Sequence, residues 1–126
     1  MRLHRRLRKE RPDNGLSLTK LSVLGRIDRD GPATASTIAE AERIQPQSMT
    51  RVVAELEALG LIERLADQTD RRRVLLRPTD AGHALIDEDR RQRDEWLMVA
   101  MDQQLTAAER DILRVAATLL DQLAEA

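Results

Sequence analysis

The segment between Pro46 and Gly60 constrains the fold of this chain more than any other feature. Proline suits the first position of a helix, where its missing N–H costs nothing, and glycine suits the C-terminal cap. Between these two residues the apolar side chains recur at helical spacing, and the opposite face of the first turns is polar. The segment is therefore predicted to be an amphipathic helix with an apolar stripe of Met49, Val52, Val53, Leu56 and Leu59.

Cap residues and chain breaks predict three shorter helices before this one. In the first, Leu3 and Leu7 lie four residues apart, and in the second, Leu21, Leu24 and Ile27 share a face. A tight connection at residues 44–45 then leads into the helix that Pro46 begins. The three are a helix over residues 1–11, a helix that Ser17 caps and residues 30–32 end, and a helix that Thr34 caps and that ends near Arg43.

The sequence after Gly60 predicts an antiparallel hairpin with a charged tip. Residues 61–65 and 73–77 are short apolar or mixed runs that flank the tip at 66–72, and Pro78 ends the second run. Thr79 is then placed to cap a long charged helix.

Two long helices are predicted to complete the chain. The first extends from Asp80 to about Asp102, and the Thr106–Glu109 capping box opens the second. The expected buried residues of the first are Ala81, Leu85, Ile86, Trp96 and Val99, and those on one face of the second are Ile112, Leu113, Ala116, Leu120 and Leu123.

Composition excludes several classes of protein. The chain has 126 residues, which suits one compact domain, and it has no cysteine, so disulfides, thiol nucleophiles and cysteine-based zinc sites are excluded. The longest apolar run, Trp96–Met101, is far shorter than the roughly 20 residues of a membrane span, and the N-terminus lacks a signal-peptide core. We therefore expect no membrane partner and a cytoplasmic location.

Chemistry at an active site has little support in the sequence. No nucleophile with an adjacent base, no paired carboxylates with a plausible cleft and no phosphate-cradling glycine loop is visible, so neither an enzyme nor a cofactor is expected. His4 and His83 look isolated, and we expect no metal site. Trp96 is the only aromatic residue, so a stacking platform for single-stranded nucleic acid is excluded, and its expected role is packing rather than ligand binding.

Charge is distributed unevenly along the chain, although the net charge is only −1. Residues 43–79 carry seven basic and five acidic side chains, whereas residues 80–126 carry five basic and eleven acidic ones. The middle of the chain is thus the candidate for contact with an anionic partner. Six basic residues in 1–11 either add to that contact or, as we favour, pair with the acidic C-terminal third across a dimer.

The order of the expected elements is that of a winged helix-turn-helix. Two short helices, a tight turn, a helix with a polar leading face and a charged hairpin follow one another. A major groove about 12 Å wide admits one α-helix, whose N-terminal residues reach the base edges, while the hairpin reaches an adjacent groove. The fold class expected is mainly α with a small β-hairpin wing.

Three stretches of the chain resemble the MarR family of regulators. Residues 16–24 are similar to the opening helix of its DNA-binding lobe, and residues 46–62 to its recognition helix and the exit into the wing. Residues 70–79 match the wing pattern D-x-R-x5-L-T, except that Pro78 replaces the leucine. The helix over residues 1–11 is also shorter than the first helix usual in the family.

The resemblance implies a single domain over 1–126 that acts as a homodimer on a palindromic operator in double-stranded DNA. Its parts are an N-terminal dimerisation helix and break (1–15), a winged helix-turn-helix lobe (16–79) and two C-terminal dimerisation helices (80–126). It further implies a transcriptional regulator, most often a repressor, released by a small organic effector bound between the lobe and the terminal helices. The expected dimer interface comprises Leu3, Leu7, Trp96, Ile112, Leu113, Leu120 and Leu123.

The DNA-binding residues expected from this placement fall into three groups. Recognition-helix contacts are Gln45, Gln47, Ser48, Thr50 and Arg51; wing contacts are Asp70, Arg71, Arg72 and Arg73; phosphate contacts are Thr34, Ser36 and Arg43. Arg72 is the first choice for insertion into the minor groove, Arg71 the second, and Arg73 is expected on a phosphate.

Other roles compete with DNA contact at several of these residues. Thr34 and Ser36 can simply cap a helix, while Arg43 and Arg64 can pair with Glu40 and Glu63. The alternative for the whole protein is a winged-helix module that docks another protein without binding DNA.

Overall fold

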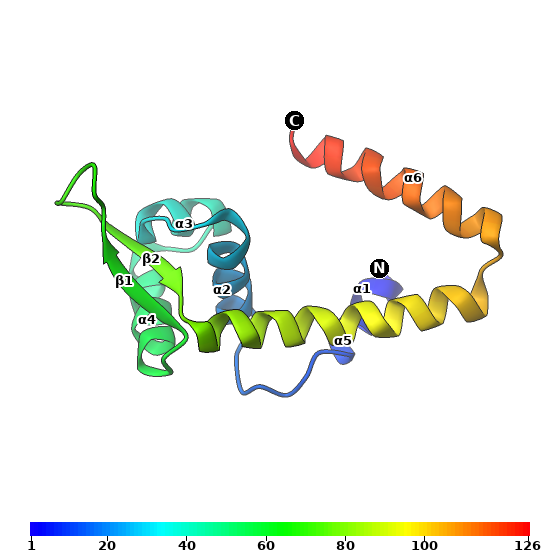
Figure 1. Ribbon diagram of the computed structural model, residues 1–126, viewed down its shortest axis with the longest axis horizontal. Coiled ribbons are helices and arrows are strands. Elements are labelled where there is room, and N and C mark those ends of the chain that lie inside the picture. The colour runs from blue at the N-terminus through cyan, green and yellow to red at the C-terminus, as the bar shows by residue number, and fades with distance from the viewer. The chain divides into compact units, whose positions relative to one another are not determined.

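The computed structural model describes residues 1–126 and contains six helices and one two-stranded antiparallel sheet (Figure 1). None of the six helices combines the length and the apolar character that a membrane span requires. In chain order the elements are α1 (Arg2–Lys9), α2 (Leu18–Asp30), α3 (Ala35–Glu42), α4 (Pro46–Ala58), β1 (Ile62–Ala66), β2 (Val74–Pro78), α5 (Asp80–Gln104) and α6 (Ala107–Ala124).

The chain forms two compact units. One is residues 12–90, and the other combines residues 1–11 with residues 91–126, so the boundary falls inside α5. The unit of residues 12–90 contains the lobe predicted over residues 16–79 together with the first turns of α5, on which Gly82 and Ile86 are buried.

Side-chain caps begin the helices where the sequence predicts them. The Ser17 hydroxyl accepts a hydrogen bond from the N–H of Lys20, and the Thr34 hydroxyl accepts one from the N–H of Thr37, each at 3.2 Å. At the start of α6, Thr106 and Glu109 form both bonds of the capping box. These caps satisfy N–H groups that no helical carbonyl can reach, which fixes where each helix starts.

The core of residues 12–90 forms where α2, α3 and α4 pack together with the hairpin and the start of α5. Four of the five residues of the predicted α4 stripe are buried. The fifth, Leu59, is exposed, because α4 ends at Ala58 and Gly60 turns the chain with a φ of +71°. The buried apolar residues are Leu21, Val23, Leu24, Ile27, Ile38, Ala39, Met49, Val52, Val53, Leu56, Leu61, Ile62, Leu76 and Ile86.

The hairpin is the wing that the sequence predicts, shifted by one residue. Ile62 pairs with Pro78 at its base and Ala66 with Val74 at its outer end, so the tip is residues 67–73 rather than 66–72. Pro78 therefore stays in register. Backbone hydrogen bonds in both directions between Ala33 and Leu76 also attach the segment before α3 to β2.

The unit of residues 1–11 and 91–126 has no buried residue of its own in α1 or α6. Trp96 is partly buried, with the Arg6 guanidinium 5.2 Å from its ring centroid. Two expected buried residues of α5 are exposed: Ala81, in the other unit, and Val99. The large exposed apolar residues of this unit are Met1, Leu3, Met98, Val99, Ile112, Leu113, Val115, Leu119, Leu120 and Leu123.

Candidate nucleic-acid interface

The leading face of α4 is polar and exposed. Gln47, Ser48, Thr50 and Arg51 all face solvent, while Met49 between them is buried, so the fold fixes which side of the helix a partner can contact. The Thr50 hydroxyl donates to the carbonyl of Pro46 at 3.0 Å, which leaves its oxygen as an acceptor.

Gln45 precedes α4 as its N-cap residue. Its backbone is extended, its side chain makes no capping hydrogen bond, and it is exposed. The amide group at the start of α4 is therefore available to a partner.

The turn between α3 and α4 presents Arg43. This residue adopts the left-handed conformation with a φ of +55°, and backbone hydrogen bonds from Arg43 and Ile44 back to Glu40 and Ala39 close the end of α3. The Arg43 side chain is exposed and forms no ion pair, with Glu40 or any other residue. Two roles were open for Arg43, a phosphate contact or an ion pair with Glu40, and the structure contains no such ion pair.

Arg64, unlike Arg43, does form an ion pair. It pairs with Glu57 of α4 at 2.7 Å, and the expected partner Glu63 instead pairs with Arg77 across the hairpin, also at 2.7 Å. Glu63 and Arg77 are directly opposite residues of β1 and β2, so their pairing follows from the strand register.

Two aspartates shape the tip of the wing. Asp67 accepts hydrogen bonds from the N–H and the hydroxyl of Thr69, and Asp70 accepts one from the N–H of Arg72 at 3.0 Å. The two hydrogen bonds from Thr69 hold the pKa of Asp67 below its ordinary value. Side-chain bonds of this kind stabilise turns, so the tip holds its arginines on an ordered loop.

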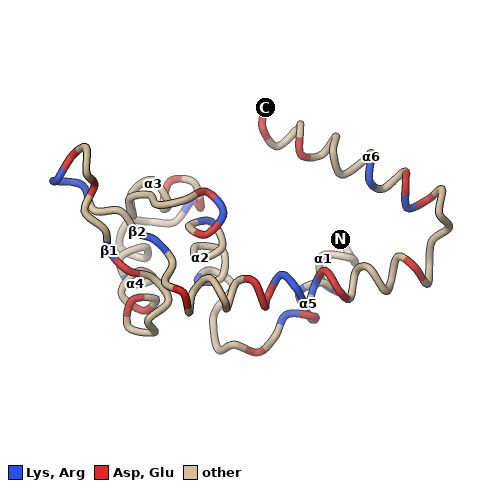
Figure 2. The backbone as a smooth tube through the Cα atoms, in the orientation of Figure 1, with Lys and Arg blue, Asp and Glu red and all other residues tan.

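The three wing arginines differ in their contacts. The guanidinium Nε of Arg72 lies 3.7 Å from Asp70, yet its side chain is 95% exposed, and Arg73 lies 3.8 Å from Asp67. Asp70 thus makes one long contact with the side chain of Arg72 rather than a bidentate fork. Arg71 is exposed and has no ion pair or hydrogen bond of its side chain. Figure 2 shows this basic run at the end of the hairpin.

Within residues 12–90, the basic side chains without an acidic partner all lie on the turn between α3 and α4, on α4 or at the wing tip. Arg43, Arg51 and Arg71 form no salt bridge, and they lie on the helix-turn-helix turn, on α4 and at the wing tip. Every other basic side chain of the unit has a carboxylate within 4.0 Å: Lys20, Arg26, Arg29, Arg64, Arg72, Arg73, Arg77 and Arg90.

The N-terminus of α3 carries the remaining expected residues. Thr34 caps the helix and its hydroxyl also donates to the hydroxyl of Thr37 at 2.9 Å, so its capping role is established. Ser36 is exposed. A pocket of about 440 Å³ separates this residue from Thr50 of α4, with an apolar wall that includes Ala39 and Met49.

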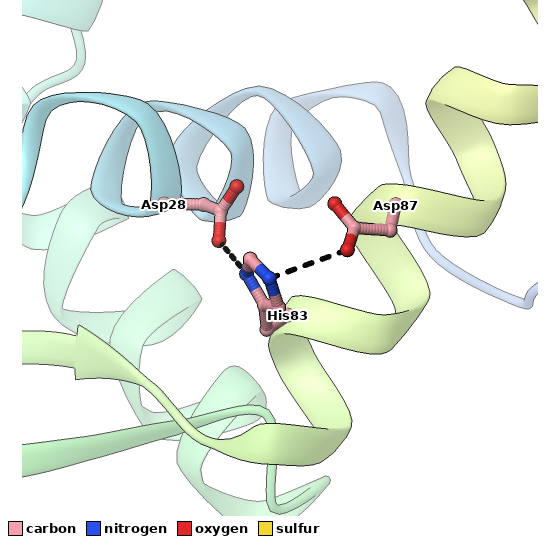
Figure 3. A group of neighbouring side chains, drawn as sticks. All are labelled: Asp28, His83 and Asp87. Atoms are coloured by element: carbon pink, nitrogen blue, oxygen red, sulfur yellow. Dashed lines mark hydrogen bonds and ion pairs between the residues drawn. The ribbon is translucent and has the colours of Figure 1, made fainter.

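The expectation that His83 is isolated is wrong. Its two ring nitrogens face Asp28 of α2 and Asp87 of α5 (Figure 3), and the three ligand atoms lie within 4.8 Å of one another. Asp87 lies one helical turn after His83, a spacing visible in the sequence, but nothing local indicates that Asp28 lies beside them.

Residues 12–90 have the fold of a winged helix-turn-helix, and their unpaired arginines lie on the turn between α3 and α4, on α4 and at the wing tip. Among protein families, the model of the MarR family matches residues 16–74. An uncharacterized HTH-type transcriptional regulator of Mycobacterium bovis is 41% identical over 120 residues, which cover 95% of this chain and 83% of that protein. The chain belongs to the MarR family, which consists of transcriptional regulators rather than enzymes.

Solved structures agree with this assignment. A putative transcriptional regulator from Pseudomonas aeruginosa matches with a TM-score of 0.86 and 36% identity, over 98% of this chain and 86% of that one. FabT from Streptococcus pneumoniae, solved in complex with DNA, shares the fold with a TM-score of 0.70 and 23% identity, over 87% of this chain and 76% of that one.

Proposed function

We propose that this protein is a repressor that binds a palindromic operator in double-stranded DNA as a homodimer. The observation that carries the proposal is the placement of Arg43, Arg51 and Arg71, the only cations of residues 12–90 without an acidic partner. A guanidinium already paired with a carboxylate must break that contact to bind a phosphate, whereas a free one gains the whole interaction and releases counterions from the DNA. FabT, which shares the fold, was solved in complex with DNA, and this supports DNA as the partner.

The recognition helix in this proposal is α4. Gln45 and Gln47 present amides that can pair bidentately with adenine, and Arg51 presents a guanidinium that can pair with guanine. Ser48 and Thr50 offer hydroxyl oxygens to bases or phosphates, and Ser36 with Arg43 offers phosphate contacts. The exposure of all these side chains supports the assignment.

In the wing, Arg72 is proposed to enter the minor groove. The Asp70 carboxylate holds the Arg72 backbone and lies near its guanidinium, so the side chain is oriented yet free to reach outward. A narrow minor groove has an enhanced negative potential that attracts arginine. Arg71, which has no partner, and Arg73 are proposed to contact phosphates.

The dimer is proposed from the surface of α6. Its apolar residues recur at helical spacing and are largely exposed in one chain, Ile112 at 66% and Leu123 at 72%. A contiguous stripe of exposed apolar side chains marks an interaction surface. In a twofold dimer the two α4 helices contact half-sites about 10 to 10.5 bp apart, which is why the operator is expected to be palindromic. Leu3, Leu7 and Trp96 are proposed to extend this interface.

A salt-titrated gel shift on duplexes from the upstream region of the protein's own gene tests DNA binding. Arg71→Ala should weaken binding to all sequences and reduce the salt slope by about 1, whereas Arg51→Ala should lose discrimination worth about 1–3 kcal/mol. Arg64→Ala is the matched control, because Arg64 is an exposed arginine of the same lobe that is already paired with Glu57. Equal binding to random DNA, or none, would instead favour the protein-docking module.

Release by a small organic ligand is the last part of the proposal. A ligand that prefers one arrangement of the dimer shifts the population towards it and so changes DNA affinity. The measurement is operator affinity with and without a broad panel of small organic compounds. Affinity unchanged by the whole panel would remove this part and leave DNA binding intact.

A further inference from the structure

A second cluster of chemically active side chains lies where α2 meets the start of α5, within residues 12–90 (Figure 3). The Nδ1 atom of His83 is 2.5 Å from Oδ1 of Asp28, and its Nε2 atom is 3.2 Å from Oδ2 of Asp87. The Asp28 side chain is only 5% exposed, whereas His83 and Asp87 are more than half exposed. One side of the cluster is therefore fixed in the protein and the other is open to solvent.

Arg90 holds the Asp28 carboxylate from behind and lies at the edge of ion-pair distance from Asp87. Its guanidinium is 2.7 Å from Oδ2 of Asp28 and 4.0 Å from Oδ1 of Asp87, and it also donates to the carbonyl of Gly25 at 3.4 Å. Each aspartate thus turns one oxygen towards Arg90 and the other towards the imidazole. Outer contacts of this kind hold metal-ligating carboxylates in place in metalloproteins.

The three donor atoms have the chemistry of a transition-metal site. Imidazole nitrogen and carboxylate oxygen both bind Zn²⁺, with bonds of about 2.0 to 2.2 Å, so tetrahedral ligands stand roughly 3.3 Å apart. The donors here are within 4.8 Å of one another. A single ion binds only one of the two ring nitrogens. At Nδ1 the ion lies beside Asp28, and the exposed Asp87, one turn from His83 on α5, rotates from the Nε2 side to complete the ligand set, which leaves a further coordination position for water.

The competing occupant of the same space is a proton. Hydrogen bonding to Asp28, and then the charges of Asp28 and Asp87, raise the pKa of His83 above its ordinary value, against the smaller effects of its burial and of Arg90. Burial raises the pKa of Asp28, but its hydrogen bonds from His83 and Arg90 outweigh this and lower it. With a neutral imidazole, the two carboxylates and Arg90 leave one net negative charge, which attracts a cation.

We propose that Asp28, His83 and Asp87 bind a divalent transition-metal ion of the Zn²⁺ class, with Arg90 as the outer partner of Asp28. The bound ion joins α2 to α5 by coordinate bonds, beyond the hydrogen bonds and packing that already hold these helices. The proposal does not depend on whether the protein binds DNA.

The composition of the chain makes a direct test possible. It has two histidines and no cysteine, so Zn²⁺ can be followed through the imidazole ¹⁵N resonances of His83 and His4 alone. At about pH 8, above the ordinary histidine pKa of about 6.5, one equivalent of Zn²⁺ per chain should shift the nitrogens of His83 and leave those of His4 unchanged. An excess of Mg²⁺, which binds poorly to imidazole, should not displace the zinc.

Variants separate this site from adventitious binding. Asp87→Asn alters an exposed side chain and should weaken Zn²⁺ binding at least about 100-fold, beyond the 10- to 100-fold typical of losing an outer partner. His4→Gln should leave the affinity unchanged. Zinc should also raise the thermal midpoint of the wild-type protein but not that of Asp87→Asn, because a ligand that binds only the folded state stabilises it.

Two results overturn the proposal. One is His83 nitrogens that respond to protons but not to Zn²⁺, which makes the cluster an ion-pair network alone. The other is zinc binding that survives Asp87→Asn or disappears in His4→Gln, which places the ion elsewhere.

Discussion

Some arginines of this protein join its own helices through ion pairs, and Arg26 is the clearest case. It extends from α2 to Glu42 at the end of α3 at 2.5 Å and to Asp30 at 3.2 Å, while Ser22 donates to the other oxygen of Glu42 at 2.7 Å. Burial raises the pKa of Glu42, but the hydrogen bonds from Arg26 and then Ser22 outweigh it and hold the pKa below its ordinary value. Glu42 thereby fastens α3 to α2.

Glu42→Gln should lower the free energy of unfolding at neutral pH by about 1–2 kcal/mol, since a hydrogen bond to a charged group is lost and a neutral one remains. Because the folded-state pKa is depressed, this stabilisation is present above the pKa of the unfolded carboxyl and is lost as pH falls through the folded pKa. Urea unfolding of both proteins over a descending pH series measures the difference, which should vanish in acid.

The matched control is Asp30→Asn, which removes the second carboxylate on the same Arg26. Asp30 is half exposed, so its loss should cost at most about 1 kcal/mol. A cost of Glu42→Gln that stays constant down to low pH would contradict the charge-based account.

At its start, α5 approaches the base of the hairpin very closely. A Cβ atom on Gly82 would lie 2.0 Å from the carbonyl oxygen of Leu61, the residue that leads into β1. The N–H of Thr79 also donates to that carbonyl, so the oxygen has little freedom to move. The glycine is what lets α5 pack against the base of the wing.

Gly82→Ala should therefore destabilise the protein by about 2–3 kcal/mol, despite the gain of up to about 1 kcal/mol that alanine brings to a helix. Gly25→Ala in α2 is the control, because its Cβ would meet only Ile86 at 3.8 Å, an ordinary contact. It should be neutral or stabilising by up to about 1 kcal/mol. Chemical unfolding of the two variants checks the contrast, and equal stabilities would refute it.

Element boundaries could be predicted from the sequence because their causes are local. Ser17, Thr34 and Thr106 act within three residues of themselves, so each cap is readable in place. Contacts between elements are not local. Asp28 and His83 are 55 positions apart, and their meeting depends on the register of α2 against α5, which no periodicity encodes.

The same limit applies to the candidate DNA site. The sequence indicates which residues lie on the outer face of α4 and at the wing tip, and the structure leaves these exposed. Which of their charges are neutralised depends on neighbours in space: Arg64 finds Glu57 rather than Glu63, while Arg43 finds no partner. The burial of Gly82 was missed for the same reason, because a close approach by Leu61 leaves no mark on the local pattern.

The whole molecule has one well-buried core, in residues 12–90, and none in the other unit. Isolated helices depend on tertiary packing for most of their stability, and the apolar face of α6 lacks it within one chain. An open hollow of about 400 Å³ on that helix is lined by Ile112, Val115, Ala116 and Leu119, with Asp111 at its edge. A second copy of the chain is the proposed source of the missing packing.

A double substitution, Leu120→Asp with Leu123→Asp, should convert the proposed dimer to a monomer of 14.3 kDa, because it places charges inside an apolar interface. Sedimentation equilibrium measures the mass directly. Thr118→Asp is the control on the polar side of α6, where the mass of the dimer should persist. A wild-type protein that sediments as a monomer at micromolar concentration would overturn the dimer and leave the DNA-binding lobe unaffected.

The contact of Arg6 with Trp96 has a consequence for optical work on this protein. Since the chain contains no tyrosine or phenylalanine, all of its near-ultraviolet absorption and intrinsic fluorescence come from one indole, beside α1 and in the unit that lacks a core. Emission spectra therefore report on the surroundings of Trp96 among the terminal helices and carry no signal from the winged lobe. A melting curve recorded by fluorescence should report the surroundings of Trp96 alone, whereas one recorded by circular dichroism at 222 nm sums over all six helices.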